Sequence, residues 1–247
     1  MLLGRDSLER RLTSRISKTQ IDRLGARLRK GQVSESDLRL LEDYRRAFGE
    51  AYRSVVLTIR RQHGLEPTGR PSKSTSSVIE KLQRETIRLS QIQDIAGCRV
   101  VVTDVAEQER VVASLRALFP GASIVDRRKT PTYGYRAVHV IVEVNERLVE
   151  VQIRTTLQHL WAELSEKFSD VVDPTIKYGG GESEVRNLLL GRSELVSRLE
   201  KLEQEMLTPG RAVPEELKKE LEGLKVDMTK SSADLKSIVG RLGRSRG

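Results

Sequence analysis

The amino-acid sequence predicts an α/β (α+β) fold, in which helices flank a mixed β-sheet and both ends of the chain are helical extensions. Three observations predict it: a β-hairpin within residues 131–155, a strand–helix–strand pattern within residues 92–125, and amphipathic helical patterns around them. A chain of 247 residues with 37% hydrophobic content can bury one core of about 110 to 130 residues. We expect an N-terminal helical extension (1–65), a core domain (66–178), and a C-terminal helical hairpin with a basic tail (179–247).

Two helical patterns occupy the N-terminal extension. Residues 6–30 are rich in Arg and Leu and end at Gly31, which is typical of one or two short basic helices. Ser34, followed three residues later by Asp37, predicts the start of a longer helix that ends near Gly64. Its apolar stripe, which we interpret as core, comprises Leu38, Leu41, Tyr44, Phe48, Tyr52, Val55, Val56 and Ile59.

A breaker-rich loop precedes the next helix. Ser77 and Glu80 match a capping box at the start of this helix, and Lys81 lies one turn inside it. Free amide groups and the helix dipole both favour an anion at such a terminus, so Arg70 and Lys73 in the loop suggest a phosphate site. A solvated basic linker is the more common interpretation of the same pattern.

Residues 92–104 predict a buried strand that follows a turn containing Gly97. Asp94 precedes this strand, and carboxylates at such positions commonly hold magnesium. The alternative is a turn aspartate bonded to its own backbone. Asp104 predicts the cap of the next helix, and residues 122–125 predict a further strand.

The single cysteine, Cys98, lies in the apolar run of this strand, and we interpret it as core rather than as a nucleophile. One cysteine excludes an internal disulfide and a cysteine-based zinc site, so we expect a reducing, cytoplasmic setting. No apolar run approaches the roughly 20 residues needed to span a bilayer, and we expect no membrane partner. The net charge of +9 favours phosphate-bearing partners in general.

Residues 131–155 predict a hairpin whose two-residue turn is Asn145-Glu146. Directly opposed residues of an antiparallel pair share a face, so the register produces one wholly apolar face and one polar face. The apolar face comprises Val138, Val140, Val142, Val149, Val151 and Ile153. The polar residues of the other face are His139, Glu143, Glu150, Gln152 and Arg154.

The polar face of the hairpin has two interpretations. An ordinary half-exposed sheet also alternates in this way, which makes a solvated face the plain one. Polyanion binding is favoured by the sequence context, because Gly134-Tyr135 precedes the first strand and Arg127, Arg128 and Lys129 lie just upstream.

The C-terminal third is expected to be helical. Residues 155–168 predict a helix whose inward positions are Leu157, Leu160, Trp161 and Leu164. Two further helical stretches within residues 182–240 flank a breaker segment, residues 208–214. Their expected inward positions are Leu195, Leu199, Leu202, Met206, Leu217, Leu221, Leu224, Met228 and Leu235. Such a hairpin packs on its own domain or on a second copy, and we expect a homo-oligomer formed through terminal helices.

With these residues together, the chain resembles the RelA/SpoT family of (p)ppGpp synthetases, specifically small alarmone synthetases, which carry the synthetase domain alone. The resemblance covers about residues 66–168. Its most specific segments are Gly134-Tyr135-Arg136-Ala137-Val138-His139, Glu150-Val151-Gln152-Ile153-Arg154-Thr155 and Asp94-Ile95-Ala96-Gly97-Cys98-Arg99, with Lys73, Ser77 and Lys81 at four-residue spacing. It implies a nucleotidyltransferase-like mixed sheet of about five strands.

The resemblance implies transfer of the β,γ-pyrophosphate of ATP to the 3′-hydroxyl of GDP or GTP, with Mg²⁺ as cofactor. Asp94 and Glu150 would hold the metal and act in catalysis, and Tyr135 would stack on the acceptor guanine. The residues implied to hold ATP are Arg70, Lys73, Ser77, Lys81 and Arg99. Those implied to hold the acceptor are Lys129, Tyr135, Arg136, His139 and Gln152.

Three functions stay open at this point. The first is a cytoplasmic enzyme that makes guanosine alarmones. The second keeps the chemistry but uses the 3′ end of tRNA as acceptor, which the basic terminal helices would suit. The third is a catalytically silent nucleotide- or RNA-binding module, against which the presence of both Asp94 and Glu150 argues. With no His-Asp dipeptide in the chain, we expect no alarmone hydrolase activity.

Overall fold

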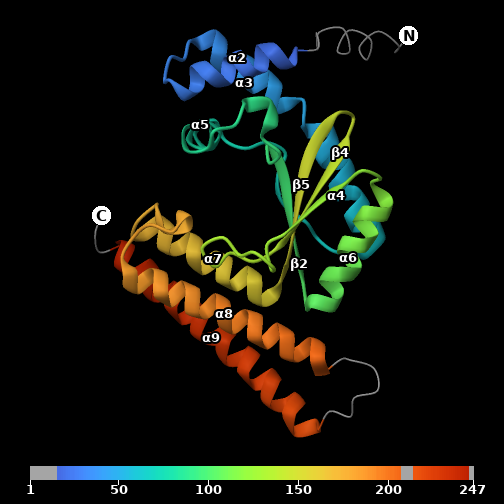
Figure 1. Ribbon diagram of the computed structural model, residues 1–247, viewed down its shortest axis with the longest axis vertical. Helices are drawn as coiled ribbons and strands as arrows, with labels where there is room; N and C mark the ends of the chain where they lie inside the picture. The colour runs from blue at the N-terminus through green and yellow to red at the C-terminus, as the bar shows by residue number, and fades with distance from the viewer. Residues whose placement is uncertain (1–15, 207–213, 245–247) are drawn as a thin grey trace. The chain divides into compact units, whose positions relative to one another are not determined.

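The computed structural model describes residues 16–206 and 214–244, so part of the predicted helical stretch 6–30 lies outside the described residues. Its helices are α2 (Lys18–Arg29), α3 (Glu35–Arg46), α4 (Gly49–His63), α5 (Thr75–Arg84), α6 (Val105–Leu118), α7 (Thr156–Val171), α8 (Ser183–Met206) and α9 (Glu215–Arg244), with short 3-10 helices η1 (Leu89–Gln91) and η2 (Ile176–Tyr178). The strands are β1 (Thr68–Arg70), β2 (Ala96–Val102), β3 (Ser123–Asp126), β4 (Val138–Val144) and β5 (Arg147–Thr155). They form one sheet in the order β1-β2-β5-β4-β3, which confirms the predicted fold class (Figure 1).

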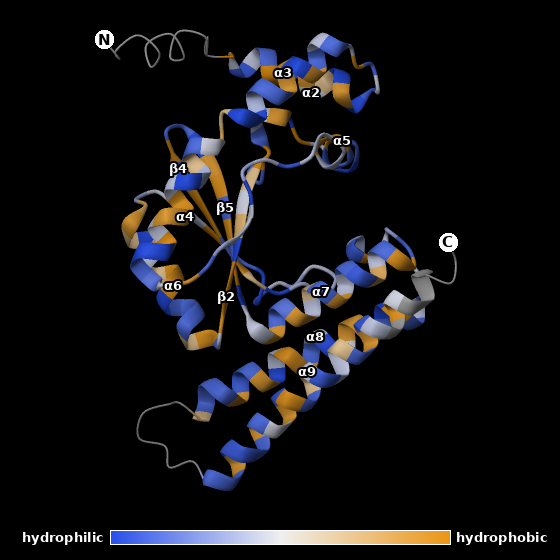
Figure 2. Cartoon of the chain, turned by 180° about the vertical axis from the view of Figure 1, so that it is seen from behind, coloured by the Kyte–Doolittle hydropathy of each residue, from blue (hydrophilic) through white to orange (hydrophobic). Residues whose placement is uncertain are grey.

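The predicted hairpin register is confirmed. Asn145 and Glu146 have positive φ values of 51° and 61°, as a type I′ two-residue turn requires, and its twist matches that of the flanking strands. All six residues of the predicted apolar face are buried, and β4 and β5 are predominantly hydrophobic in Figure 2. The polar-face residues His139, Glu150 and Gln152 are only partly buried. The two-residue turn therefore sets the register of the hairpin, and the register decides which face each side chain lies on.

The chain divides into two compact units, and three strands contribute residues to both. Unit 1 consists of residues up to 62, residues 68–98 and residues 141–150; unit 2 consists of residues 63–67, 99–140 and 151 onward. In unit 1, α2 packs against α3, α5 and η1. The fully buried side chains of these helices include Leu24, Leu28, Leu82 and Leu89.

The long helix expected between Ser34 and Gly64 is two helices. Ser34 caps α3 through a capping box with Asp37, as predicted, but α3 ends at Arg46 and α4 begins at Gly49. At the break, Phe48 is buried and its ring meets that of Tyr44 edge-on at 5.3 Å. Leu38 is exposed rather than part of the core. Packing of Phe48 and the low helix propensity of Gly49 therefore outweigh the continuity of the stripe.

The predicted cap of α5 is displaced by three residues. Ser74, not Ser77, is the N-cap, and the backbone N–H of Ser77 donates to Ser74 Oγ at 3.2 Å. The Lys73 N–H donates to the Ile95 carbonyl at 2.6 Å. Residues 74–77 are three serines and a threonine, which offer several local caps. The long-range bond of Lys73 places the chain so that Ser74 is the one used.

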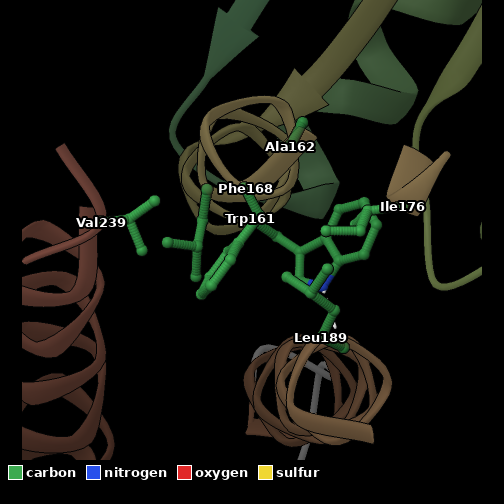
Figure 3. Close-up of a cluster of buried hydrophobic side chains, with 7 residues drawn as sticks. Trp161, Ala162, Phe168, Ile176, Leu189 and Val239 are labelled. Atoms are coloured by element: carbon green, nitrogen blue, oxygen red, sulfur yellow. Dashed lines mark hydrogen bonds between the residues drawn. The ribbon is translucent and has the colours of Figure 1, made fainter. Parts of the chain in front are cut away.

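In unit 2, α8 and α9 pack against α7, and Figure 1 shows the three helices side by side. Trp161 lies at the centre of a buried cluster that also contains Phe168, Ile176, Leu189 and Val239 (Figure 3). Its indole N–H donates to the Leu189 carbonyl at 2.7 Å. The C-terminal hairpin thus docks on its own chain, which was one of the two interpretations of its pattern.

The stripe predicted for this hairpin is only half correct. Leu199, Leu221 and Met228 are buried with Leu157 and Val196 in a second cluster. The predicted inward positions that are exposed instead are Leu195, Leu202, Leu217 and Leu224. The predicted apolar stripe of α8 and α9 therefore includes more residues than their packing buries. Among the described residues, no helix combines the length and apolarity that a membrane crossing requires.

Candidate functional site

Lys73, Lys81 and Asp94 form an ion-paired cluster in unit 1. Lys73 Nζ lies 2.6 Å from Asp94 Oδ2, and Lys81 Nζ lies 2.9 Å from Asp94 Oδ1. The exposed fraction of the side chain is 13% for Lys73, 21% for Lys81 and 20% for Asp94. Each carboxylate oxygen of Asp94 therefore pairs with one lysine, and all three side chains are largely buried. Burial would raise the pKa of Asp94, but the two lysines outweigh it and hold that pKa at about 2.

Local structure brings these three side chains together. Asp94 precedes β2, Lys73 precedes the cap of α5, and Lys81 lies in α5. The bond from the Lys73 N–H to the carbonyl next to Asp94 ties the two loops, and Ser77 Oγ accepts from Ser74 Oγ at 2.8 Å. With Ser74 as the cap, Lys81 lies in the last turn of α5 rather than one turn inside it. The cluster therefore presents two cations and one anion beside this helix, an arrangement suited to a polyphosphate and its counter-ion.

Two glycines of unit 1 allow neighbouring strand segments to approach each other closely. A Cβ on Gly97 would lie 3.1 Å from the Glu150 carbonyl oxygen, and a Cβ on Gly69 would collide with the Gly97 carbonyl. Arg70, next to Gly69, is exposed, and Glu150 is partly buried on β5. Buried Cys98 is confirmed as core: burial and then the Glu150 charge raise the pKa of its thiol to about 12.

A second cluster, in unit 2, surrounds Tyr135. The Tyr135 hydroxyl lies 2.9 Å from His139 Nε2. Arg154 Nη2 donates to the Tyr135 hydroxyl at 3.1 Å and to Gln152 Oε1 at 2.8 Å. The Arg154 guanidinium carbon stands 5.0 Å from the centroid of the Tyr135 ring, and the Trp161 ring centroid is 6.5 Å away. Three residues predicted to bind an acceptor thus share one contact network.

Arg154 is the member of this network that the sequence analysis did not select. It is 3% exposed, and its Nε and Nη1 atoms have no hydrogen-bond partner among the described residues. A signal was available, because Arg154 follows Glu150 and Gln152 on the polar face of β5. Arginine is rarely fully buried, so an arginine two positions after the predicted ligand Gln152 on a strand with a buried face is a candidate for the same site.

Arg99 lies on β2 with its Nη2 3.5 Å from Glu166 Oε1. Burial and the charge of Arg154 lower the pKa of Arg99, and its Nε has no hydrogen-bond partner among the described residues. Burial, followed by the charges of Arg99 and Arg154, lowers the pKa of His159 on α7. The charges of Arg99 and Arg154 therefore repel each other, which favours an anion near them.

Lys129 and Arg136 share a second environment. They line a cavity of about 580 Å³ together with Arg128, Glu200 and Lys201. Arg136 Nε donates to Ser193 Oγ at 3.1 Å and its Nη1 donates to the Arg128 carbonyl at 2.8 Å. The predicted acceptor residues are therefore placed in two environments rather than one.

The side chains of unit 1 include carboxylates suited to a hard cation. The described residues contain no cluster of three or more His, Cys, Asp or Glu side chains arranged for a metal. Asp94 and Glu150 nevertheless offer the oxygen ligands that Mg²⁺ prefers, and Mg²⁺ is usually held by one or two carboxylates together with water and substrate phosphates. The donor set fits magnesium bound with a nucleotide better than a metal held by protein alone.

Comparisons with known proteins converge on one family. The model for the region found in RelA/SpoT proteins matches residues 69–169. An uncharacterized protein of Mycobacterium tuberculosis is 40% identical over 112 residues, which are 43% of this chain and 41% of that protein. The chain thus spans about two fifths of the length of that relative. The GTP pyrophosphokinase YjbM of Bacillus subtilis is 32% identical over 149 residues, 54% of this chain and 67% of that enzyme.

Solved structures agree with this result. Small alarmone synthetase 1 from Bacillus subtilis is 27% identical, with a TM-score of 0.51 over 70% of this chain and 96% of that one. The same enzyme bound to its product pppGpp gives the same TM-score and identity. Its structure bound to AMPCPP, at 24% identity and a TM-score of 0.52, is similar in fold.

Proposed function

Because the chain belongs to the RelA/SpoT family and contains a domain of the small alarmone synthetase type, we propose that it is a pyrophosphokinase that makes (p)ppGpp. It transfers the β,γ-pyrophosphate of ATP to the 3′-hydroxyl of GDP or GTP and releases AMP. The observation that supports this most is the ion-paired cluster that Lys73, before the cap of α5, and Lys81, in its last turn, form with Asp94. Phosphoryl-group transfer depends mainly on positioning and on charge neutralisation, and this cluster offers both.

The residues of unit 1 bind ATP in this proposal. Lys73 and Lys81 exchange their contacts with Asp94 for contacts with the phosphates, while Ser77 and Arg70 complete the ATP side. Asp94 is then free to bind Mg²⁺ together with Glu150. The metal, when bound, neutralises charge on the transferred phosphates. Lysines that are already held together by one carboxylate and partly buried need little reorganisation to meet a polyphosphate, which is why the cluster favours this role.

The acceptor side depends on Tyr135 and its neighbours in unit 2. A planar ring binds a purine by stacking, which contributes about 1 to 3 kcal/mol per base. His139 contacts the Tyr135 hydroxyl, and Gln152 accepts from Arg154, which contacts the same hydroxyl. Arg99 remains on the ATP side of the proposal and adds positive charge for the ATP phosphates. One of the similar structures is bound to pppGpp and another to AMPCPP. These ligands support a guanine nucleotide and an adenine nucleotide as partners of this chain.

Glu150 is the proposed base for the acceptor. It draws the proton from the 3′-hydroxyl as the oxygen attacks the β-phosphorus, while the bond from that phosphorus to the α,β-bridging oxygen breaks and AMP departs. Its place on the polar face of β5 follows from the confirmed hairpin register.

A second candidate keeps this chemistry and changes the acceptor to the 3′ end of tRNA. The position of Lys129 and Arg136 favours it, because these two cations line a cavity of about 580 Å³, which suits a larger polyanionic acceptor. The net charge of +9 also suits a polyanion. A non-catalytic nucleotide-binding module is the third possibility.

The experiment that separates these functions follows the label of ATP carrying ³²P at its γ-phosphate. The protein is incubated with this ATP and Mg²⁺ together with GDP, GTP or tRNA, and the products are separated. We expect label on the guanine nucleotide and release of AMP. The same assay on Glu150→Gln tests the proposed base. Glu143→Gln is its matched control, because Glu143 is exposed on the same face of the hairpin. Label on tRNA alone would establish the second function, and nucleotide binding without transfer would establish the third.

A further inference from the structure

Arg154 is a buried arginine whose contacts converge on Tyr135. It stands over the Tyr135 ring at 5.0 Å and donates through Nη2 to the Tyr135 hydroxyl at 3.1 Å. The first contact is a cation–π interaction with the face of the ring, and the second restrains its far end. Together they restrain both torsions of the tyrosine side chain, so the ring has a defined plane before any ligand arrives.

Other neighbours complete the restraint on this ring. The His139 ring meets the Tyr135 ring edge-on, with centroids 5.6 Å apart and planes at 67°. The Trp161 ring is tilted by 56° at 6.5 Å. His139 and Trp161 are thus inclined to the ring, whereas the Arg154 guanidinium covers its face. Among these neighbours, Arg154 alone touches both the ring face and the hydroxyl.

The remaining donors of Arg154 argue against a purely structural role. A structural arginine at 3% exposure is expected to have its N–H groups paired, because an unpaired buried donor lowers stability. Here Nε and Nη1 have no partner among the described residues. Burying a cation without a carboxylate hydrogen-bonded to it is costly, and an apolar residue at this position would cost less. The charge is therefore better explained by what it does to Tyr135.

We propose that Arg154 is a positioning residue that holds the Tyr135 ring in the plane that the acceptor base stacks on, and that it thereby sets affinity for the acceptor nucleotide. This inference rests on the proposed function. A ring held in place before binding loses no rotational freedom when the base arrives, so the base binds more tightly than it would to a mobile ring. Since ATP does not use this ring, its affinity is independent of Arg154.

The test compares Arg154→Met, which removes the charge, with Arg154→Lys, which keeps the charge and loses the planar fork. Arg110→Met, at an exposed position of α6, is the control for loss of an arginine. Trp161 is the one tryptophan of the sequence, so its fluorescence reports GDP binding close to Tyr135. We expect both Arg154 variants to raise the Kd and KM for GDP about three- to tenfold. The KM for ATP and kcat should stay within about twofold.

A double substitution separates positioning from general loss of structure. In a Tyr135→Ala background, Arg154→Met should have no further effect on GDP affinity, because the ring it holds is gone. Tyr135→Phe, which keeps the ring and loses the hydroxyl bond, should weaken GDP binding less than Arg154→Met does. Thermal melts establish that each variant is folded.

Each outcome decides the question. Additive effects of Arg154→Met and Tyr135→Ala, or equal weakening of ATP and GDP, would overturn the positioning role. If the wild-type protein binds GDP but transfers no pyrophosphate, the proposed function fails, and the Kd values alone decide the role of Arg154. If it binds neither nucleotide, both proposals fail.

Discussion

Replacing Asp94 with Asn keeps the shape of the side chain and leaves two partly buried lysines without their counter-ion. The pKa of Asp94 is held at about 2 against an ordinary value of 3.8. At about 1.4 kcal/mol per pKa unit, this difference corresponds to roughly 2 kcal/mol of unfolding free energy at neutral pH. The side chains are at most 21% exposed, so solvent screening removes little of it.

The pH dependence has a defined sign. Because the pKa of Asp94 is lower in the folded protein, its stabilising effect is fully present above the ordinary pKa of 3.8 and is lost as the pH falls toward 2. The difference in melting temperature between wild type and Asp94→Asn should therefore be constant from pH 7 down to about pH 5 and should shrink below pH 4. At neutral pH we expect about 4 to 8 °C, since 1 kcal/mol corresponds to about 2 to 4 °C for a chain of this size.

Thermal melts of wild type, Asp94→Asn and the control Asp43→Asn measure this effect. Asp43 is exposed on α3, so its replacement should leave the melting temperature unchanged. Adding Lys73→Met to Asp94→Asn should recover part of the loss, because one of the two uncompensated ammonium groups is removed. Equal melting temperatures for wild type and Asp94→Asn at pH 7, or a difference that is unchanged at pH 2.5, would refute this account of the cluster.

Four further outcomes are expected. Glu150→Gln should lower single-turnover transfer about a hundredfold or more with little change in ATP affinity, and near-normal transfer by the folded variant would exclude the catalytic role. Tyr135→Ala should raise the KM for GDP far more than that for ATP, which steady-state kinetics will measure. Gly134→Ala should lower the melting temperature by several degrees, because Gly134 has a φ of 87° and a Cβ there would lie 2.8 Å from Trp161 Cζ2. In light scattering, full-length protein should have the mass of an oligomer, and a monomeric mass would exclude assembly through the terminal helices.

Elements with local determinants were predicted well from the sequence. The hairpin depends on a two-residue turn and on alternation along each strand, so the positions of His139, Glu150 and Gln152 on one face followed from residues next to one another in the chain. Asp104 was likewise recognised as the cap of α6, because its side chain bonds an N–H only three residues away. Magnesium binding and the acceptor are untested and stay predictions.

Features that depend on distant residues were decided by tertiary structure. The break at Phe48 follows from packing against a ring and against Arg147, whose guanidinium lies 5.5 Å from the Phe48 ring in a segment almost a hundred residues away. The choice of Ser74 over Ser77 follows from a bond to the strand segment at residue 95. Local propensity differs little between such alternatives, so one long-range contact is enough to select among them.

The candidate site shows the same division. Sequence alone determined which residue types are present and which strand or helix each occupies, because hydrophobic periodicity and caps act within a few residues. It also carried the family segments around Gly134 and Glu150. Only the folded chain paired Asp94 with both lysines, bonded Arg136 to Ser193 on α8, and placed the Arg154 guanidinium over the tyrosine ring. These contacts join residues 13 to 57 positions apart, and their energies depend on burial and distance, which no spacing along the chain specifies.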